Sequence, residues 1–395
     1  EDRSPESDHR LAAEGMPFPW RWGSGTISTQ LDVIWGMSDG SYPLAMAEPF
    51  TFSGVEVAPG RREIIDLPIT DLSTRTPMTM PVQVVNGRRD GPRLFLCAAL
   101  HGDEINGVEI IRRVLRLSAL KRIKGTLVAV PIVNVFGFIS LSRYLPDRRD
   151  LNRSFPGSPR GSLAGRLAHL FRDQVVGQCS HGIDLHTGAI HRDNYPQVRA
   201  DLDDTEAESM ALAFGVPVVI NAGLLKGSLR EAARQGGVPV IVYEAGEALR
   251  FDEACIRAGV MGVVRVMRML GMLPPSKRRH RRAAPLVARS SIWVRAPESG
   301  VLRPAVALGS HVREGDVLGV IADPFGKNEA PVVSRAGGVV IGRSNLPLVH
   351  EGDALFHVVQ VEGTQVAART LDAFEPEADY EVGLTSELTD EPPIV

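Results

Sequence analysis

Cysteine is scarce in this sequence, whose 395 residues include only Cys97, Cys179 and Cys255. An odd number of widely separated cysteines predicts neither a disulfide framework nor a paired-cysteine metal site. The chain also lacks an apolar run of about 18 residues, the length that a membrane-spanning helix needs. No basic segment followed by an apolar secretory leader is present. These absences favour a protein of the reducing cytoplasm that does not associate with membranes.

An excess of charge of one sign is missing too. The 44 lysines and arginines nearly balance the 47 aspartates and glutamates, which leaves a formal net charge of -3. Such a balance gives no overall attraction for nucleic acid or for an acidic membrane surface. With 44% apolar residues, the chain can form a sizeable core and a second small domain. The composition therefore predicts a globular protein of enzyme size whose ligands are small polar molecules.

Three segments differ in composition from the rest. Residues 1–45 are polar and then rich in proline, glycine and tryptophan, which predicts a poorly ordered extension, with Met46 as an alternative start. Residues 273–289 combine prolines with a basic run and are typical of a solvated linker between domains. Residues 364–395 are strongly acidic and predict a flexible tail.

Between residues 46 and 272, apolar patterns typical of strands and of helices alternate along the chain. Alternation at 80–85 and a continuous apolar run at 93–100 predict strands, the second buried on both faces. Apolar residues at helical spacing predict a helix over 105–116. The remaining predicted strands are 125–133, 181–186, 216–220 and 238–246, and the remaining helices are 162–176, 204–214, 228–235 and 251–272.

This alternation predicts an open α/β sheet, mostly parallel, with helices on both faces. Ligands of such sheets bind beyond the carboxyl ends of the strands. His101, His186 and Glu244 each lie at or just after the end of a predicted strand. One crevice could therefore collect all three side chains.

The region after the linker contains an internal repeat. Residues 299–321 are echoed by 337–359, and the EGD sequence at Glu314–Asp316 recurs at Glu351–Asp353. Two copies of strand, strand, EGD turn and strand predict a small all-β sandwich or barrel over residues 290–363, hereafter the C-terminal module.

The C-terminal module resembles the biotinyl/lipoyl carrier fold. A carrier needs a lysine at the tip of the hairpin between the two copies, where this chain has Phe325. Lys327, two residues later, lacks the flanking methionines of a carrier. We therefore expect a structural or substrate-gating module without a swinging arm.

His101 and Glu104 lie three residues apart in the sequence HGDE, where a buried strand meets the start of a helix. A catalytic zinc ion commonly takes two imidazoles and one carboxylate and keeps one position open. Gly102 would let the backbone turn sharply beneath the metal. His186 in DLHTGA could supply the third ligand, and Asp184 could orient its ring. Each histidine could instead be an ordinary strand-end residue.

Two further segments carry charged residues that packing does not explain. Residues 142–157 concentrate arginines around Asn152 and Arg153, and arginine binds carboxylates and stabilises developing oxyanions. A solvated basic loop would have the same composition. Glu244 ends a very apolar strand, where it could act as general base and then as general acid. Glu247, in the following loop, is the alternative.

Taken in order, the segments HGDE, DLNRSFPG and DLHTG and the strand-end glutamate resemble the succinylglutamate desuccinylase/aspartoacylase family of the zinc carboxypeptidase superfamily. The resemblance covers residues 75–270 and implies a zinc-carboxypeptidase-like mixed, mostly parallel sheet. It further implies the roles of particular residues. One zinc ion per chain would be bound by His101, Glu104 and His186, Glu244 would be the general base, Arg143 would polarise the scissile carbonyl, and Asn152 and Arg153 would hold a substrate carboxylate.

Some of these positions have competitors. Arg148 and Arg149 are alternatives to Arg143 in the same loop. Arg234 matches a further substrate arginine of the family, Arg230 competes with it, and either could be a helix-surface charge. The C-terminal module differs from the shorter capping domain of the best-known members. Among relatives, predicted deacylases and N-acetyl-diaminobutyrate deacetylases look most similar.

The sequence as a whole predicts a zinc-dependent amidohydrolase, a deacylase acting on a small N-acyl amino acid. Zinc would lower the pKa of water toward ~7, and Glu244 would take the proton and return it to the leaving amine. A zinc carboxypeptidase acting on peptides is the first alternative. A non-catalytic carrier or binding module centred on residues 290–363 is the second. A homo-oligomer is compatible with the sequence, which does not fix the oligomeric state.

Overall fold

The computed structural model describes residues 47–276 and 284–361, together with Leu371 and Phe374. The predicted extension at 1–45, most of the linker's basic run and almost all of the acidic tail lie outside the described residues. The predictions for those segments stay predictions. Every helix in the described part of the chain is too short or too polar to traverse a lipid bilayer.

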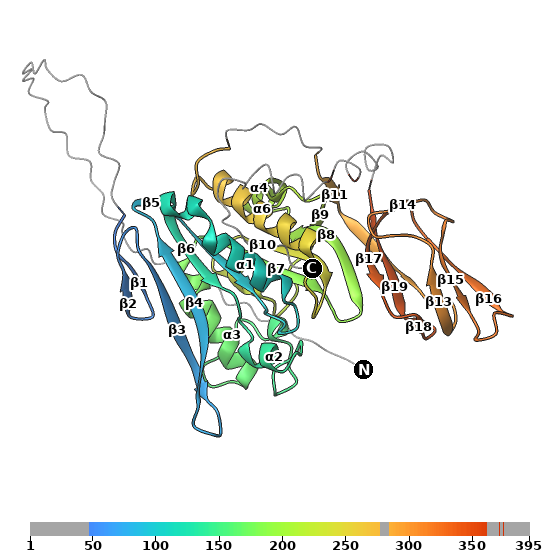
Figure 1. The fold of residues 1–395 in the computed structure, drawn as a ribbon, viewed down its shortest axis with the longest axis horizontal. Coiled ribbons are helices and arrows are strands. Elements are labelled where there is room, and N and C mark those ends of the chain that lie inside the picture. The colour runs from blue at the N-terminus through green and yellow to red at the C-terminus, as the bar shows by residue number, and fades with distance from the viewer. Residues whose placement is uncertain (1–46, 277–283, 362–370, 372–373, 375–395) are drawn as a thin grey trace, which may run out of the picture. The chain divides into compact units, whose positions relative to one another are not determined.

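A mixed sheet of thirteen strands organises the described residues (Figure 1). Four parallel strands at its centre pair in the order β10, β7, β5 and β6. The parallel arrangement predicted from the sequence is confirmed for these strands. Their bounds are Arg89–Ala98 for β5, Lys124–Val130 for β6, His181–Gly188 for β7 and Val240–Glu247 for β10.

Most pairs outside these four strands are antiparallel, so the prediction of a mostly parallel sheet does not hold there. Strand β4 (Pro77–Asn86) pairs antiparallel with β6, and β3 (Arg62–Asp71) with β4. On the other side, β8 (Arg192–Ala200) returns antiparallel along β10. Only three residues separate β7 from β8, and a parallel connection would need a dozen or more.

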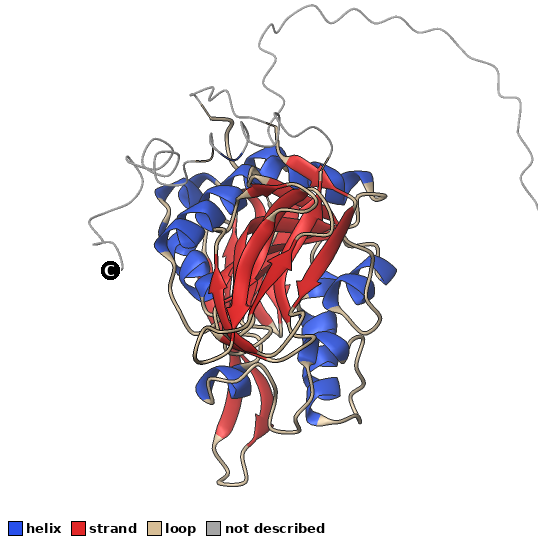
Figure 2. Cartoon of the chain, turned by 90° about the vertical axis from the view of Figure 1, so that its right-hand side faces the viewer, coloured by secondary structure: helices blue, strands red, loops and turns tan. Residues whose placement is uncertain are grey.

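Helices cover both faces of the sheet, as predicted (Figure 2). Successive residues of β5 alternate between the two cores: Leu94 and Leu96 face one core, while Phe95 and Cys97 face the other. The first core includes α1 (Asn106–Arg116), α4 (Thr205–Phe214) and α6 (Glu253–Met269). The second includes α2 (Val135–Ile139), α3 (Leu163–Gln174), α5 (Leu229–Gln235), β1 (Phe50–Phe52) and β2 (Val55–Val57). Short 3-10 helices occupy Ser118–Arg122, Leu151–Arg153 and Val176–Gln178.

The C-terminal module is all-β, and its two copies interlock. The short strand of each copy pairs with the first strand of the other, β14 with β17 and β18 with β13. Strands β16, β15, β13 and β18 form a separate four-stranded sheet. The bounds are Ser290–Arg295 for β12, Gly300–Pro304 for β13, His311–Val312 for β14, Val317–Ala322 for β15, Glu329–Val333 for β16, Gly338–Ser344 for β17, Leu348–Val349 for β18 and Ala354–Gln360 for β19.

The two EGD turns of the repeat have the same conformation. Gly315 and Gly352 adopt φ values of +90° and +85°, a region open to glycine at little cost. The aspartate after each glycine accepts a hydrogen bond from the backbone N–H three residues earlier, at 2.7 Å in the first copy and 2.8 Å in the second. The repeat seen in the sequence is therefore a repeat of structure.

Strand β8 joins the C-terminal module to the central sheet. The first residues of β8 pair antiparallel with β17, with Asn194 opposite Gly342. Its later residues pair parallel with β9 (Val218–Asn221). Part of the predicted linker also belongs to the sheet, because Leu286–Ala288 form β11 alongside β9. The sheet is thus continuous from β3 to β12.

His357 of β19 is a buried histidine at this junction. Burial, with Arg199 and Arg192 nearby, lowers its pKa to about 3. A histidine in an unfolded chain has a pKa of about 6.5, so between these two pKa values the unfolded state binds more protons than the folded state. The free energy of unfolding therefore decreases as the pH falls through this window.

We expect His357→Gln to remove this pH dependence. Between about pH 7 and about pH 5, the wild type should lose about 2 kcal/mol more of its free energy of unfolding than the variant does. Urea denaturation at both pH values measures the difference, and His350→Gln, at an exposed position of the same module, is the control. If the wild type and His357→Gln lose the same free energy of unfolding, His357 does not have a lowered pKa.

Candidate active site

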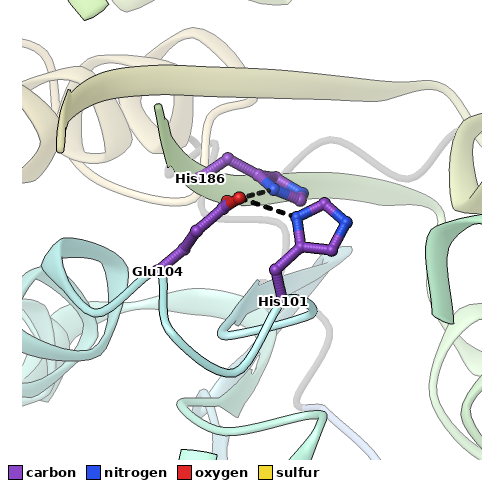
Figure 3. A group of neighbouring side chains, drawn as sticks. All are labelled: His101, Glu104 and His186. Carbon is purple, nitrogen blue, oxygen red and sulfur yellow. Dashed lines mark hydrogen bonds and ion pairs between the residues drawn. The ribbon is translucent and has the colours of Figure 1, made fainter. Parts of the chain in front are cut away.

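Two histidines and a glutamate converge at the carboxyl ends of neighbouring parallel strands (Figure 3). His101 follows β5, Glu104 lies just before α1, and His186 is in β7. The Glu104 carboxylate lies between the rings, with Oε1 2.8 Å from His101 Nδ1 and Oε2 2.7 Å from His186 Nδ1. One candidate ligand atom of each residue lies within 4.8 Å of the others. All three side chains are buried, so the sequence-predicted ligands form one compact group.

Each imidazole also contacts a second carboxylate. His101 Nε2 lies 3.2 Å from Asp150 Oδ1, and His186 Nε2 lies 2.7 Å from Asp184 Oδ2. When Nε2–H donates to the outer carboxylate, Nδ1 keeps its lone pair and can bind a metal. Two oriented imidazoles and one carboxylate are a donor set that zinc favours. The residues present therefore fit a metal ion of this type.

The charges of this group depend on one another. Burial alone would raise the pKa of Glu104, but the two imidazoles hold it well below its usual range. Burial likewise would lower the pKa of His186, but Asp184 and Glu104 raise it well above the ordinary value. The pKa of His101 is raised for the same reason by Glu104 and Asp150. The group thus attracts protons or a cation to the space beside Glu104.

Gly102 is needed for close packing and not for the sharp backbone turn that the sequence predicted. The residue in this turn with left-handed backbone is Ala99, with φ of 50°, whereas Gly102 has no positive φ. A Cβ on Gly102 would lie 2.0 Å from the backbone carbon of Gly137 in α2. The glycine is required because the loop that carries His101 and Glu104 packs directly against the backbone of α2.

Arg143 is the arginine of its loop that reaches the ligand group. Its guanidinium donates to Glu104 Oε1 at 3.1 Å and to Asp150 Oδ2 at 3.0 Å. Asp150 therefore contacts both His101 and Arg143. The alternatives Arg148 and Arg149 are exposed and do not line the pocket described below.

Glu244 lies beside His186 across the parallel pair of β10 and β7, where the two residues are in register. Its Oε2 accepts from Asn194 Nδ2 at 3.2 Å and forms an ion pair with Arg199 at 3.0 Å. Among the described residues, Oε1 has no hydrogen-bond partner. Glu247 instead accepts hydrogen bonds from His191 N and Asn345 Nδ2 and is not in the pocket. Of the two glutamates, Glu244 is the one that lines the pocket.

A pocket of about 430 Å³ opens beside the ligand group. Of the predicted substrate residues, Asn152, Arg153 and Arg230 line it, whereas Arg234 does not and forms an ion pair with Asp204. The remaining lining includes four residues that the sequence analysis did not select, namely Arg192, Asn194, Arg199 and Trp293.

A bulge explains why the residues of β8 were missed. Between Glu244 and Gly246 of β10, the partners on β8 change from Gln197 to Asn194, so β8 contains one extra residue. A bulge reverses the alternation of side chains along the strand. Asn194 and Arg199, which are five residues apart, therefore both reach the pocket, and no period-two pattern in the sequence could show this.

The pocket brings a glutamate and an arginine together with a buried group of two histidines and one carboxylate. Metal-dependent hydrolases use such an arrangement. Residues 90–270 match the model of the succinylglutamate desuccinylase/aspartoacylase catalytic domain. The matched segment includes His101, Glu104, His186 and Glu244, which line or adjoin the pocket.

Similarity to individual proteins extends beyond the catalytic segment. The chain is 29% identical over 336 residues to the N-alpha-acetyl-L-2,4-diaminobutyric acid deacetylase of Halomonas elongata, covering 81% of this chain and 95% of that protein. A solved succinylglutamate desuccinylase/aspartoacylase from Rhodobacter sphaeroides is 25% identical, with a TM-score of 0.68 over 76% of this chain and 96% of that one. An ectoine utilization protein from Ruegeria pomeroyi, 23% identical, shares the fold with a TM-score of 0.69 over 79% of this chain and 99% of its own.

The ligand assignment predicts the metal content of variants. We expect about one zinc per chain in the wild type and loss of most of it in His101→Ala and His186→Ala, because each removes one of three ligands. Elemental analysis measures the metal, and far-UV circular dichroism checks the fold. His169→Ala, in α3, is the matched control. Full occupancy in both ligand variants would show that the metal is bound elsewhere.

The packing of Gly102 predicts a large penalty for one methyl group. Gly102→Ala should lower the free energy of unfolding by about 3 kcal/mol, the upper part of the range for overpacked sites, because backbone must move. Gly165→Ala in α3 is the control, since its Cβ would make only ordinary contacts and alanine favours a helix. If the two variants unfold at similar urea concentrations, the close approach does not constrain the loop.

Proposed function

We propose that this protein is a zinc-dependent deacylase that hydrolyses the amide bond of a small N-acyl amino acid. The observation that carries the proposal is the shared pocket of Glu244 and the His101, Glu104 and His186 group. The match of residues 90–270 to the family model and the similarity to a deacetylase of N-acetylated diaminobutyric acid support an amide substrate. The catalytic domain would comprise residues 46–272, with the module at 290–363 completing the pocket.

His101, Glu104 and His186 would hold the zinc ion, with Asp150 and Asp184 fixing the two rings. When bound, zinc supplies Lewis acidity, which makes water more acidic and a carbonyl more electrophilic. Glu104 and the two histidines are buried, and this dry environment strengthens electrostatic interactions in the site.

Glu244 would act as the general base and then as the general acid. Asn194 and Arg199 hold Oε2, while Oε1 has no partner among the described residues. A carboxylate held at one oxygen presents the other in a fixed direction. Oε1 would therefore take the proton of the attacking water and deliver it to the amine that leaves.

Arg143 would stabilise the negative charge that develops on the carbonyl oxygen. Its guanidinium already lies within hydrogen-bond distance of the ligand Glu104, so it is next to the place where that charge forms. Asn152, Arg153 and Arg230 line the same pocket and would hold the substrate carboxylate. Arg230 is fixed by hydrogen bonds to the carbonyls of Ala222 and Gly223.

The alternatives have weaker support. A carboxypeptidase must admit a peptide chain, and here Trp293 of the C-terminal module forms part of the wall of a pocket of about 430 Å³. A pocket of this size suits a small ligand. A carrier would need a lysine at the tip of the hairpin between β15 and β16. In this chain Phe325 stands at that tip and is 85% exposed. The three buried, free cysteines are in keeping with the expected reducing cytoplasm.

A substrate screen tests the proposed function. The zinc-loaded full chain is assayed against N-acetyl, N-succinyl and N-formyl amino acids and against dipeptides with a free C-terminus. Hydrolysis of one acyl series and not of the dipeptides is the expected result. Faster release of C-terminal residues from peptides would favour the carboxypeptidase.

Glu244→Gln should separate binding from chemistry. Glutamine keeps the size of the side chain but cannot accept a proton, so we expect kcat to fall by about 10⁴-fold, the upper end of the effect of a general base. Zinc content, measured on the same sample, should be unchanged. Glu247→Gln is the control and should keep most of the activity. If the two variants have similar kcat values, Glu244 is not the base.

A further inference from the structure

Three residues stack at the part of the pocket where the C-terminal module meets the central sheet. The guanidinium of Arg192, in β8, lies 5.1 Å from the ring centroid of Trp293 in β12. The imidazole of His357 in β19 lies 4.6 Å from a Trp293 ring with an interplanar angle of 7°. Arg192 and Trp293 both line the pocket. The pocket thus has a wall made jointly by the catalytic domain and the module.

The module holds Trp293 firmly. His357 is its partner across the antiparallel pair of β12 and β19, and His357 Nε2 lies 2.9 Å from the hydroxyl of Ser291. Because the pKa of His357 is lowered by burial, its ring is neutral near pH 7. A neutral, buried ring against the indole fixes the indole without adding a charge to the pocket. Trp293 can therefore act as a platform for a cation.

Arg192 is the cation on this platform, and the part of the chain that the structure describes gives it no counter-ion. Within residues 47–276 and 284–361, no carboxylate lies within 4.0 Å of its guanidinium. Its backbone is fixed by the tight connection after β7, where Arg192 N donates to Ala189 O at 2.9 Å. The aromatic ring orients the guanidinium but leaves its N–H groups free for an anion.

The other arginines of the pocket are already occupied. Arg143 binds Glu104 and Asp150, and Arg199 forms an ion pair with Glu244. Arg230 donates to two carbonyls, and Arg153 donates to the carbonyl of Asn152 at 2.6 Å. Among these arginines, only Arg192 combines an orienting ring with a guanidinium that makes no hydrogen bond to the described residues.

We propose that Arg192, held on Trp293, is a specificity-determining residue that binds a second carboxylate of the substrate. This inference rests on the proposed function and narrows its substrate class to N-acyl amino acids with an acidic group besides the α-carboxylate. The second carboxylate could belong to the amino acid or to the acyl group. A substrate with a free amine in that position would face an unpaired guanidinium and be disfavoured.

Matched substrates that differ in one charge test the proposal. N-acetylglutamate and N-acetylglutamine place the carboxylate or its neutral amide on the amino acid. N-succinylglycine and N-succinamoylglycine place the same pair on the acyl group. We expect kcat/KM to favour the acidic member of one pair by about ten- to a hundredfold, the effect of a charge-assisted hydrogen bond.

Arg192→Gln should remove this preference by slowing the acidic substrate while leaving its neutral partner nearly unchanged. Trp293→Ala should weaken the preference and Trp293→Phe should keep most of it, because phenylalanine still offers a ring. Arg335→Gln, an exposed arginine of the module, is the matched control and should behave as the wild type. A wild type without preference in either pair, or an unchanged preference in Arg192→Gln, would overturn the proposal.

A binding measurement separates failure of this inference from failure of the proposed function. Trp293 is the only tryptophan after residue 46, so in a Trp20→Phe, Trp22→Phe, Trp35→Phe background the emission reports on this wall. Glutarate should change the emission at concentrations at which its monoamide does not, and Arg192→Gln should abolish the change. That result supports the Arg192 site even if no N-acyl amino acid is hydrolysed. Equal responses to glutarate in wild type and Arg192→Gln would refute it.

Discussion

A carboxylate buried between two imidazoles is the interaction on which the rest of the site depends. Glu104 is 2% exposed, and a charge at such a position is tolerated only when it is paired and hydrogen-bonded. Each imidazole extends the pairing to a further carboxylate, Asp150 or Asp184. A metal requires neutral imidazoles, so its binding would displace the protons that this network otherwise attracts. The same buried negative charge therefore stabilises either protons or a cation at one position.

Strand β8 determines how the two parts of the chain share one pocket. One edge of β8 pairs with β10, which carries Glu244, and the other edge is divided between β17 and β9. The C-terminal module is consequently an extension of the catalytic sheet, and its strand β12 can place Trp293 in the pocket wall. The module is therefore integrated into the sheet more closely than a capping domain that is joined only by a linker. Leu286–Ala288, at the end of that linker, are themselves paired in the sheet.

The sequence identified the residues whose positions follow from strand ends. His101, His186 and Glu244 could be grouped because the carboxyl ends of parallel strands meet at one edge, and the structure places them in one pocket. Arg192 and Asn194 could not be found in this way, since β8 is short of apolar residues and its bulge disrupts the alternation. Trp293 reaches the pocket through pairings between distant segments, which no local pattern contains. Arg230 and Arg234 show the same limit, because only packing decides which side of α5 faces the pocket.

The short connection between β7 and β8 is flanked by His186 near the end of β7 and by Arg192 at the start of β8. Gly188, the last residue of β7, leaves no room for a side chain, because a Cβ there would lie 2.2 Å from Arg192 O. The seven residues from His186 to Arg192 thus contain a candidate metal ligand and a candidate selectivity group. An insertion or a bulkier residue in this connection would disturb both. Change of substrate range during evolution should then be easier from the other side of the wall, through Trp293 and its neighbours. In this architecture, substitutions in the C-terminal module can change the pocket wall without altering the candidate metal ligands.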